Sequence, residues 1–429
     1  MIQSRMRSVL FVIMVALLSL GSVSAKKQPR QLQLVSILIV DRNGFTETVS
    51  SKDRLKRYQC VDFLKSQPYQ KVLRIYERDN CGNAFSVITS YHENGNLRQY
   101  LEVVNARANG MYGEWHPNGN PSLMTTVIAG NADISSEAEK TWVFDNLSYA
   151  WNEKGDLIAE IQYSQGSLEG YSTYYHPSGR VWKQIPFQSG KINGEERVYL
   201  ESGELFQQTT YAQGQKHGPS FRYWSNEQIA SQEEYKQGKL ESGQYFDSCG
   251  NMISEVSQGF GNRAVFGKQD LSELQEYKRG VLEGEVRVFG KGQRLVRMYH
   301  VKDGVSHGEE IYYYESQPDN LKPKLSVQWH RGKVQGIMKS WYPEGSIESQ
   351  REMSNNAKTG LLTAWYRDGS IMMIEEYEKD KLVRGDYFKK GEKTPVSQVA
   401  EGKGIAIIYD SEGELINKIT YERGKPQVE

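Results

Sequence analysis

The sequence predicts an all-β protein, in which an elongated stack of antiparallel β-hairpin repeats forms one long twisted sheet behind a small N-terminal β-rich cap. Three observations carry this prediction. Aromatic residues recur about every 24 residues through most of the chain. Each period holds two or three glycines, and each would cost about 1 kcal/mol inside a helix. The 429 residues are 38% hydrophobic but include 40 Gly and 27 Tyr, a composition that favours a thin sheet over a thick globular core.

Residues 1–25 have the three-part layout of a secretory signal peptide. Arg5 and Arg7 provide a positive start, the stretch from Val9 to Leu20 is apolar, and Val23-Ser24-Ala25 supplies small residues at the cleavage position. We expect cleavage after Ala25 and an exported protein, periplasmic or extracellular. The apolar run is short for a membrane span, so an uncleaved anchor is the weaker alternative. No later segment of about 20 apolar residues predicts a transmembrane helix.

Residues 26–85 are predicted to form the cap. The segment Leu32–Gly44 reads as an apolar strand that ends in a turn, and the segments 71–77 and 84–91 read as further strands. Cys60 and Cys81 are candidates for one disulfide in an oxidising compartment, with two buried thiols as the alternative. A dedicated ligand-binding domain is the other interpretation of this segment.

The repeats are predicted to occupy residues 86–260 and 261–424 as two blocks, followed by a tail, 425–429. A step of 36 residues between Trp115 and Trp151 predicts an insertion at about residues 126–142. The structural column of aromatic residues consists of Tyr91, Trp115, Trp151, Tyr175, Tyr199, Tyr223, Phe289, Tyr313, Trp341, Trp365 and Tyr409.

Particular residues explain the positions of the turns between the strands. Pairs such as Asn94-Gly95, Ser178-Gly179 and Asp368-Gly369 follow the first aromatic residue of a unit, and Gly and Asn accept the positive φ of tight hairpin connections. A single hairpin is not stable in water. We therefore expect stacked hairpins to bury their aromatic and aliphatic columns as one continuous strip.

The repeat units resemble a known family. Tyr91–Leu97 (YHENGNL), Trp115–Asn120 (WHPNGN) and Trp365–Ile371 (WYRDGSI) are similar to the MORN repeat variants of bacterial proteins. The resemblance covers roughly residues 86–424 and implies a hairpin-stack scaffold for protein interaction. Because many such proteins are antitoxin-like, it also implies toxin neutralisation as an alternative role. The export signal departs from a cytosolic antitoxin.

The sequence predicts no catalytic residue, no cofactor and no metal site, and so no enzyme. His92, His116 and His176 share one repeat slot and are expected to be turn-flanking surface residues. The glutamate pairs 195–196, 233–234, 309–310 and 375–376 are expected to be solvated strand positions rather than the facing carboxylates of a glycosidase. The 53 basic residues match the 53 acidic ones, which argues against nucleic-acid binding.

Exposed aromatic residues are the predicted carriers of binding, because Tyr and Trp are enriched at interaction hot spots. The candidates for contact with a partner neighbour the aromatic column and are Tyr174, Trp182, Trp224, Tyr312 and Tyr314. The alternative is that they stabilise the sheet as cross-strand pairs. Trp142, at the end of the predicted insertion, is a further candidate.

These observations predict an exported, non-catalytic scaffold or adaptor in the cell envelope, with protein partners of unknown identity. The first alternative is an antitoxin or immunity-type partner that neutralises a toxin. The second is a repeat protein that binds cell-wall glycan.

Overall fold

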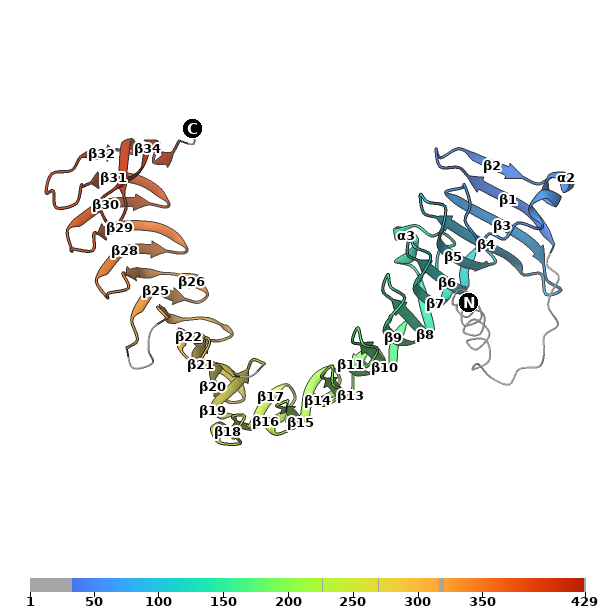
Figure 1. Ribbon diagram of the computed structural model, residues 1–429, viewed down its shortest axis with the longest axis horizontal. Coiled ribbons are helices and arrows are strands. Elements are labelled where there is room, and N and C mark those ends of the chain that lie inside the picture. Colours follow the sequence, from blue (N-terminus) through green and yellow to red (C-terminus); the bar gives the residue numbers. More distant parts are fainter. Residues whose placement is uncertain (1–32, 226, 269, 316–319, 428–429) are drawn as a thin grey trace, which may run out of the picture. The chain divides into compact units, whose positions relative to one another are not determined.

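The computed structural model describes residues 33–427, apart from residues 226, 269 and 316–319. The predicted signal peptide and its cleavage position lie outside the described residues. The rest is almost entirely β-sheet (Figure 1), which confirms the all-β prediction. The chain divides into two compact units, Met1–Gly155 and Asp156–Glu429. This boundary falls inside the first predicted repeat block, residues 86–260.

The first unit is an antiparallel sheet in which the first strand pairs with both the second and the third, and the later strands pair in chain order. Its elements are β1 (Leu34–Val40), β2 (Thr46–Val49), α2 (Lys52–Leu55), η1 (Lys56–Tyr58), β3 (Lys71–Arg78), β4 (Ala84–Tyr91), β5 (Leu97–Val104), β6 (Arg107–Trp115), β7 (Pro121–Ala129), α3 (Ser136–Glu139) and β8 (Val143–Trp151). The pairing order is β2–β1–β3–β4–β5–β6–β7–β8. Because β4 pairs with β5, the predicted cap continues into the repeat sheet.

One apolar cluster joins the cap to the first repeat. It contains Ile37, Ile39, Val49, Leu55, Phe63, Val72, Tyr91 and Leu97. The first member of the predicted aromatic column, Tyr91, therefore lies in the same core as strand β1. Burial of these side chains removes their apolar surface from water and holds α2 against the sheet.

The predicted insertion folds onto the first unit instead of projecting from it. After β7, residues 130–142 form a loop that contains the one-turn helix α3. Trp142 is buried, with its ring centroid 4.6 Å from that of Tyr112, and its Nε1 donates to the carbonyl oxygen of Asn131 at 2.9 Å. Trp142 is thus a core residue, and its prediction as a contact residue is wrong.

The second unit contains the remaining strands, which pair antiparallel in chain order. They are β9 (Leu157–Ser164), β10 (Ser167–Tyr175), β11 (Val181–Gln188), β12 (Lys191–Ile192), β13 (Gly194–Tyr199), β14 (Leu205–Ala212), β15 (Gln215–Tyr223), β16 (Ile229–Lys236), β17 (Lys239–Phe246), β18 (Met252–Ser257), β19 (Phe260–Phe266), β20 (Leu271–Lys278), β21 (Val281–Phe289), β22 (Leu295–Lys302), β23 (Val305–Ser306), β24 (Gly308–Tyr313), β25 (Pro323–His330), β26 (Lys333–Val334), β27 (Gly336–Trp341), β28 (Ile347–Ser354), β29 (Ala357–Trp365), β30 (Ile371–Glu378), β31 (Lys381–Tyr387), β32 (Ser397–Ala400), β33 (Lys403–Tyr409), β34 (Leu415–Glu422) and β35 (Lys425–Pro426). The two-residue strands β12, β23 and β26 pair only with the strand before them, and that strand also pairs with the one after them.

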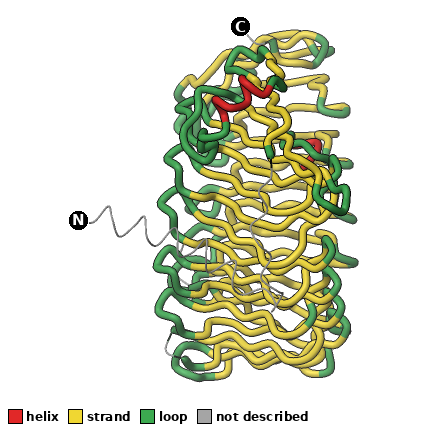
Figure 2. The backbone as a smooth tube through the Cα atoms, turned by 90° about the vertical axis from the view of Figure 1, so that its right-hand side faces the viewer, coloured by secondary structure: helices red, strands yellow, loops and turns green. Residues whose placement is uncertain are grey.

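Two kinds of turn alternate along this meander, and Figure 2 shows loops at both ends of the strands. In the glycine turns, such as Gln213-Gly214, both residues have positive φ (52° and 86°), as a two-residue type I′ hairpin requires. The other strand ends carry five-residue turns, such as residues 176–180, which His176 N–H closes by donating to the Arg180 carbonyl at 2.8 Å. Gly95, Gly179 and Gly369 all have positive φ, which confirms the predicted turn positions.

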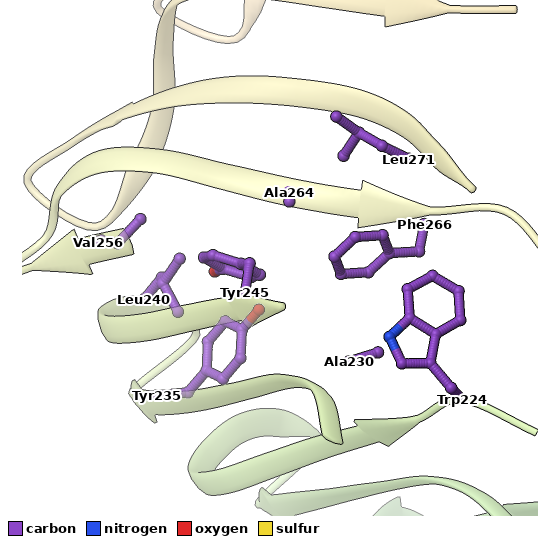
Figure 3. Close-up of a cluster of buried hydrophobic side chains, with 9 residues drawn as sticks. All are labelled: Trp224, Ala230, Tyr235, Leu240, Tyr245, Val256, Ala264, Phe266 and Leu271. Carbon is purple, nitrogen blue, oxygen red and sulfur yellow. The ribbon is translucent and has the colours of Figure 1, made fainter. Parts of the chain in front are cut away.

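Two apolar clusters of the second unit repeat each other. The first (Figure 3) contains Tyr235, Leu240, Tyr245 and Val256, and the second contains Tyr377, Leu382, Tyr387 and Val399. Corresponding residues are separated by about 142 positions, so the chain contains a longer internal repeat above the hairpin period.

The predicted aromatic column is only partly the buried strip that the spacing suggested. Tyr91 is buried, whereas Trp115, Trp151, Tyr175, Tyr199, Tyr223, Phe289, Tyr313, Trp341, Trp365 and Tyr409 are half-buried. In several repeats the next residue is the more buried ring, as with Trp224, Tyr342 and Tyr366. The strand register shifts at this position, for example between Arg222 and Tyr223, so strict alternation between the two faces ends there.

Candidate interaction surface

The first of the two repeated clusters contains a buried ion pair. Glu233, on β16, is 5% exposed and accepts hydrogen bonds from the hydroxyls of Tyr235 and Tyr245, each at 2.9 Å. Arg263 Nε, on β19, donates to the same carboxylate at 2.7 Å. Burial alone would raise the pKa of Glu233, but the charge of Arg263 and these hydrogen bonds outweigh it, so the pKa is lowered.

The second cluster repeats this arrangement without the cation. Glu375 accepts hydrogen bonds from Tyr377 at 2.9 Å and Tyr387 at 2.7 Å. When β19 and β33 are aligned on their second residues, Gly261 and Gly404, the residue in the place of Arg263 is Ala406, which is fully buried. Burial raises the pKa of Tyr245 and of Tyr387, and the neighbouring carboxylate adds to the shift, so these phenols stay protonated.

All four glutamate pairs that the sequence assigned to solvent have one buried member. These residues are Glu196, Glu233, Glu310 and Glu375. Glu310 accepts from Arg297 Nε and from Trp329 Nε1, both at 2.6 Å, and Glu196 forms an ion pair with Lys183. The expectation of solvated positions is wrong for these four, because side-chain alternation along a strand turns one residue of each adjacent pair toward the core.

A row of side-chain hydrogen bonds connects successive hairpins near the five-residue turns. Nε2 of His92, His116 and His176 lies 2.8, 3.1 and 3.0 Å from the carbonyl oxygens of Trp115, Trp151 and Tyr199. In other repeats the same slot holds Tyr314, Tyr342 or Tyr366, whose hydroxyls donate to Trp341, Trp365 and Phe388 at 2.6, 2.8 and 2.7 Å. The histidines are therefore half-buried connectors and not exposed turn residues. The interchange of His with Tyr or Trp in one slot is the signal that could have revealed this role.

The aromatic residues predicted to contact a partner differ in how far they are buried. Trp224 is buried against Phe266, with ring centroids 4.9 Å apart, and its Nε1 donates to the Phe246 carbonyl at 3.2 Å. It is a core residue, so its prediction as a contact is wrong. Tyr314 is one of the connectors above. Tyr312 is half-buried, with the Arg297 guanidinium 5.3 Å from its ring centroid, and Tyr174 is also half-buried.

Trp182 is the predicted contact residue that the structure leaves in solvent. It lies on β11 and is 46% exposed, with the His176 ring 6.3 Å away. The neighbouring strand β10 adds Tyr171, which is 54% exposed and which the sequence reasoning missed. Two adjacent strands therefore present large rings to solvent, as interaction hot spots do.

Cys60 and Cys81 are both exposed and unbonded, so the structure does not contain the predicted disulfide, and Cys249 is also free. No group of three or more His, Cys, Asp or Glu side chains that could hold a metal occurs within the described residues. In that same part of the chain, no helix has the length and apolar character to cross a bilayer.

The family profile of the MORN repeat variant matches residues 216–237 and 334–355. Two segments of the chain thus match MORN-variant repeats. Each matched segment begins just after one glycine turn and ends at the next, so one MORN-variant unit here is a strand, a five-residue turn and a strand. None of the curated proteins matches the chain.

Two solved structures share weak similarity with this chain. The Photorhabdus luminescens Tc holotoxin pore is 10% identical over 91% of this chain and 24% of that chain, with a TM-score of 0.14. A porin-like protein from Bacteroides uniformis is 9% identical over 68% of this chain and 94% of its own length, with a TM-score of 0.13. The chain thus spans about a quarter of the length of the toxin-complex chain it matches.

Proposed function

We propose that this protein is a non-catalytic, exported scaffold that binds protein partners in the cell envelope. The observation that carries the proposal is that its buried carboxylates bond within the sheet itself. Glu233, Glu310 and Glu375 bond to side chains of their own sheet, while exposed rings and turn residues remain for contact with other molecules. Repeat stacks of this kind offer extended surfaces of fixed side chains, which suits a scaffold.

Export is part of the same proposal and rests on residues 1–25. The test is expression of the full chain in a bacterium that exports proteins, followed by N-terminal sequencing of the fractionated product. We expect a mature N-terminus at Lys26 in the envelope or the medium. Recovery of an unprocessed chain from the cytosol would contradict the export proposal.

The scaffold proposal is tested by capture of partners from the envelope fraction of the native organism with the mature protein. We expect a small, reproducible set of proteins that survives washing. A W182A/Y171A variant should lose partners that use the exposed rings, while H217A, a change at an exposed residue of strand β15 away from them, serves as the control. A single captured toxin would favour the neutralisation role over the scaffold role.

A second candidate, glycan binding, is favoured by the rings of Tyr171 and Trp182 on adjacent strands, because sugar faces pack on exposed aromatic rings. Its test is sedimentation with purified cell wall. Retention of the wild type, and loss of retention in W182A/Y171A, would support it.

A further inference from the structure

The glycine turns of the second unit are bonded to one another along one edge of the sheet. The N–H groups of Gly190, Gly214 and Gly238 donate to carbonyl oxygens at the start of the preceding hairpin strand, Leu168, Ile192 and Lys216, at 2.9, 2.8 and 2.8 Å. Farther along, Gly280 N–H donates to the Gly259 carbonyl at 2.9 Å. These bonds hold the turns that they join against one another, so the side chains at these turns are preorganised for binding.

The residue that follows each two-residue turn along this edge is called its tip, including the turns Asn355-Asn356 and Lys379-Asp380, which have positive φ without glycine. Three consecutive tips are apolar, namely Phe260, Val281 and Val305, which are 53%, 43% and 42% exposed. The other tips in the second unit are Ser167, Lys191, Gln215, Lys239, Lys333, Ala357, Lys381, Lys403 and Lys425. A row that elsewhere favours lysine therefore contains one apolar stretch.

Basic side chains surround this apolar stretch. The turns at 236–239, 278–281, 302–305 and 330–333 contribute Lys236, Lys239, Lys278, Arg279, Lys302, Arg331 and Lys333, with Asp303 as the acidic residue among them. Within the described part of the chain, Lys278 is the one of these bases that forms an ion pair, with Glu276 at 2.9 Å. The edge between β16 and β27 thus combines exposed apolar tips with an excess of basic side chains.

The internal repeat shows that the fold does not require apolar tips. Leu240 N–H donates to the Gly280 carbonyl at 3.0 Å, and Leu382 N–H donates to the Gly424 carbonyl at the same distance. The bond from Gly280 to Gly259 likewise has its counterpart from Gly424 to Gly402, at 2.9 Å. In the second copy, however, Lys403 and Lys425 occupy the tips that Phe260 and Val281 occupy in the first. The backbone accepts lysine at these positions, so packing does not account for the exposed Phe and Val.

We propose that Phe260, Val281, Val305 and the bases beside them form a docking surface for an acidic segment of a partner protein. Apolar side chains of that segment cover the three tips, and its carboxylates pair with the surrounding Lys and Arg. The turns before Phe260 and Val281 are bonded to each other, because Gly280 N–H donates to the Gly259 carbonyl at 2.9 Å. With Val305 at the next turn, the three tips follow one another in a line along this edge. A single peptide segment fits such a line better than a broad lipid surface does. The inference rests on the proposed scaffold function and gives that function a site.

The test uses the full chain with the triple variant F260K/V281K/V305K. Because lysine occupies corresponding tips at 403 and 425, we expect this variant to fold with an unchanged circular dichroism spectrum and melting temperature. The probe is a fluorescent synthetic peptide of alternating Leu and Glu, with a Leu/Lys peptide as its charge control. We expect the wild type to bind the Leu/Glu peptide at least tenfold more tightly than the variant does, with affinity that falls as salt rises.

A matched control removes exposed apolar residues elsewhere in the same unit. L361K/I405K/I416K makes the same chemical change at side chains that are 50%, 49% and 63% exposed and lie outside the row of tips, and it should bind the peptide as the wild type does. Equal binding by both triple variants, or no binding of the Leu/Glu peptide by the wild type, would overturn the proposal. So would preferential binding of the wild type to phosphatidylglycerol vesicles, or self-association that only the tip variant loses.

The two proposals fail separately. If F260K/V281K/V305K still captures every envelope partner, this surface is wrong and the scaffold function stands. If the tips bind the peptide but the wild type captures no envelope protein, the docking surface stands and the proposed scaffold role does not.

Discussion

The phenol ring of Tyr245 lies across the Cα of Gly243, two residues earlier on strand β17. A Cβ atom at residue 243 would come within 2.4 Å of the Tyr245 Oη and 2.8 Å of its Cζ. The internal repeat preserves this relationship in Gly385 and Tyr387, where the corresponding distance to Oη is 2.6 Å. Only glycine leaves space for the tyrosine ring at both positions. The tyrosine hydroxyl can then reach its buried glutamate.

Gly243→Ala should destabilise the protein, because the methyl group would displace a fully buried ring that also holds a hydrogen bond. Overpacking of this kind costs about 1–3 kcal/mol, measured as the free energy of unfolding in urea. Gly267→Ala is the matched control, since a Cβ there has an ordinary contact of 3.5 Å with the Asp270 carbonyl. Equal effects of the two substitutions would show that the Tyr245 ring is not the cause.

Arg263→Ala tests the buried ion pair, because it converts the first cluster into the pattern of the second, where Ala406 takes that place. Loss of one partner of a buried pair costs about 3 kcal/mol, so the variant should be less stable at neutral pH. Its effect depends on pH in a defined direction. The lowered pKa of Glu233 means that the pair stabilises the fold above the unfolded pKa of about 4.3, and that this contribution is lost as pH falls through the lower folded value.

The measurement is the free energy of unfolding of wild type and Arg263→Ala between neutral and strongly acidic pH. We expect the two curves to converge as the pH falls. Parallel curves over the whole range would show that Arg263 stabilises the sheet by packing rather than through the charge of Glu233.

Alkaline pH should unfold the second unit through its buried tyrosines. Burial raises the pKa of Tyr235, Tyr245, Tyr377 and Tyr387 in the folded chain. Their stabilising contribution is complete below the unfolded pKa of about 10 and is lost as pH rises toward the folded values. In a titration followed by tyrosinate absorbance and circular dichroism, a group of tyrosines should ionise together with loss of β signal. Ionisation of all tyrosines before any loss of structure would contradict the buried hydrogen bonds to Glu233 and Glu375.

Tyr366→Phe tests the connectors between hairpins. It keeps the buried ring and removes the 2.7 Å hydrogen bond to the Phe388 carbonyl, which should cost about 1 kcal/mol. Hydrogen exchange should rise locally in the strands on either side of the turn at residues 366–370. Tyr171→Phe, at an exposed ring, is the control and should leave both the stability and the exchange unchanged.

Prediction from sequence was most successful where the cause is local. The position of Gly179 in a turn follows from the positive φ that a tight connection requires, and neighbouring residues suffice to predict it. It was least successful where a contact spans hairpins. Trp224 was expected on the outer face by simple alternation, but the register shift at Tyr223 turns its ring into the core beside Phe266.

The amino-acid sequence by itself determined the β class, the hairpin period and the positions of the turns, because each depends on the intrinsic φ preference and side-chain alternation of adjacent residues. Only the tertiary structure decided which acids and rings are buried. Glu233 meets Arg263 from 30 residues away, and His176 meets the carbonyl of Tyr199 from 23 residues away. Such partners are brought together by the stacking and local register of whole strands, and no single repeat carries that information.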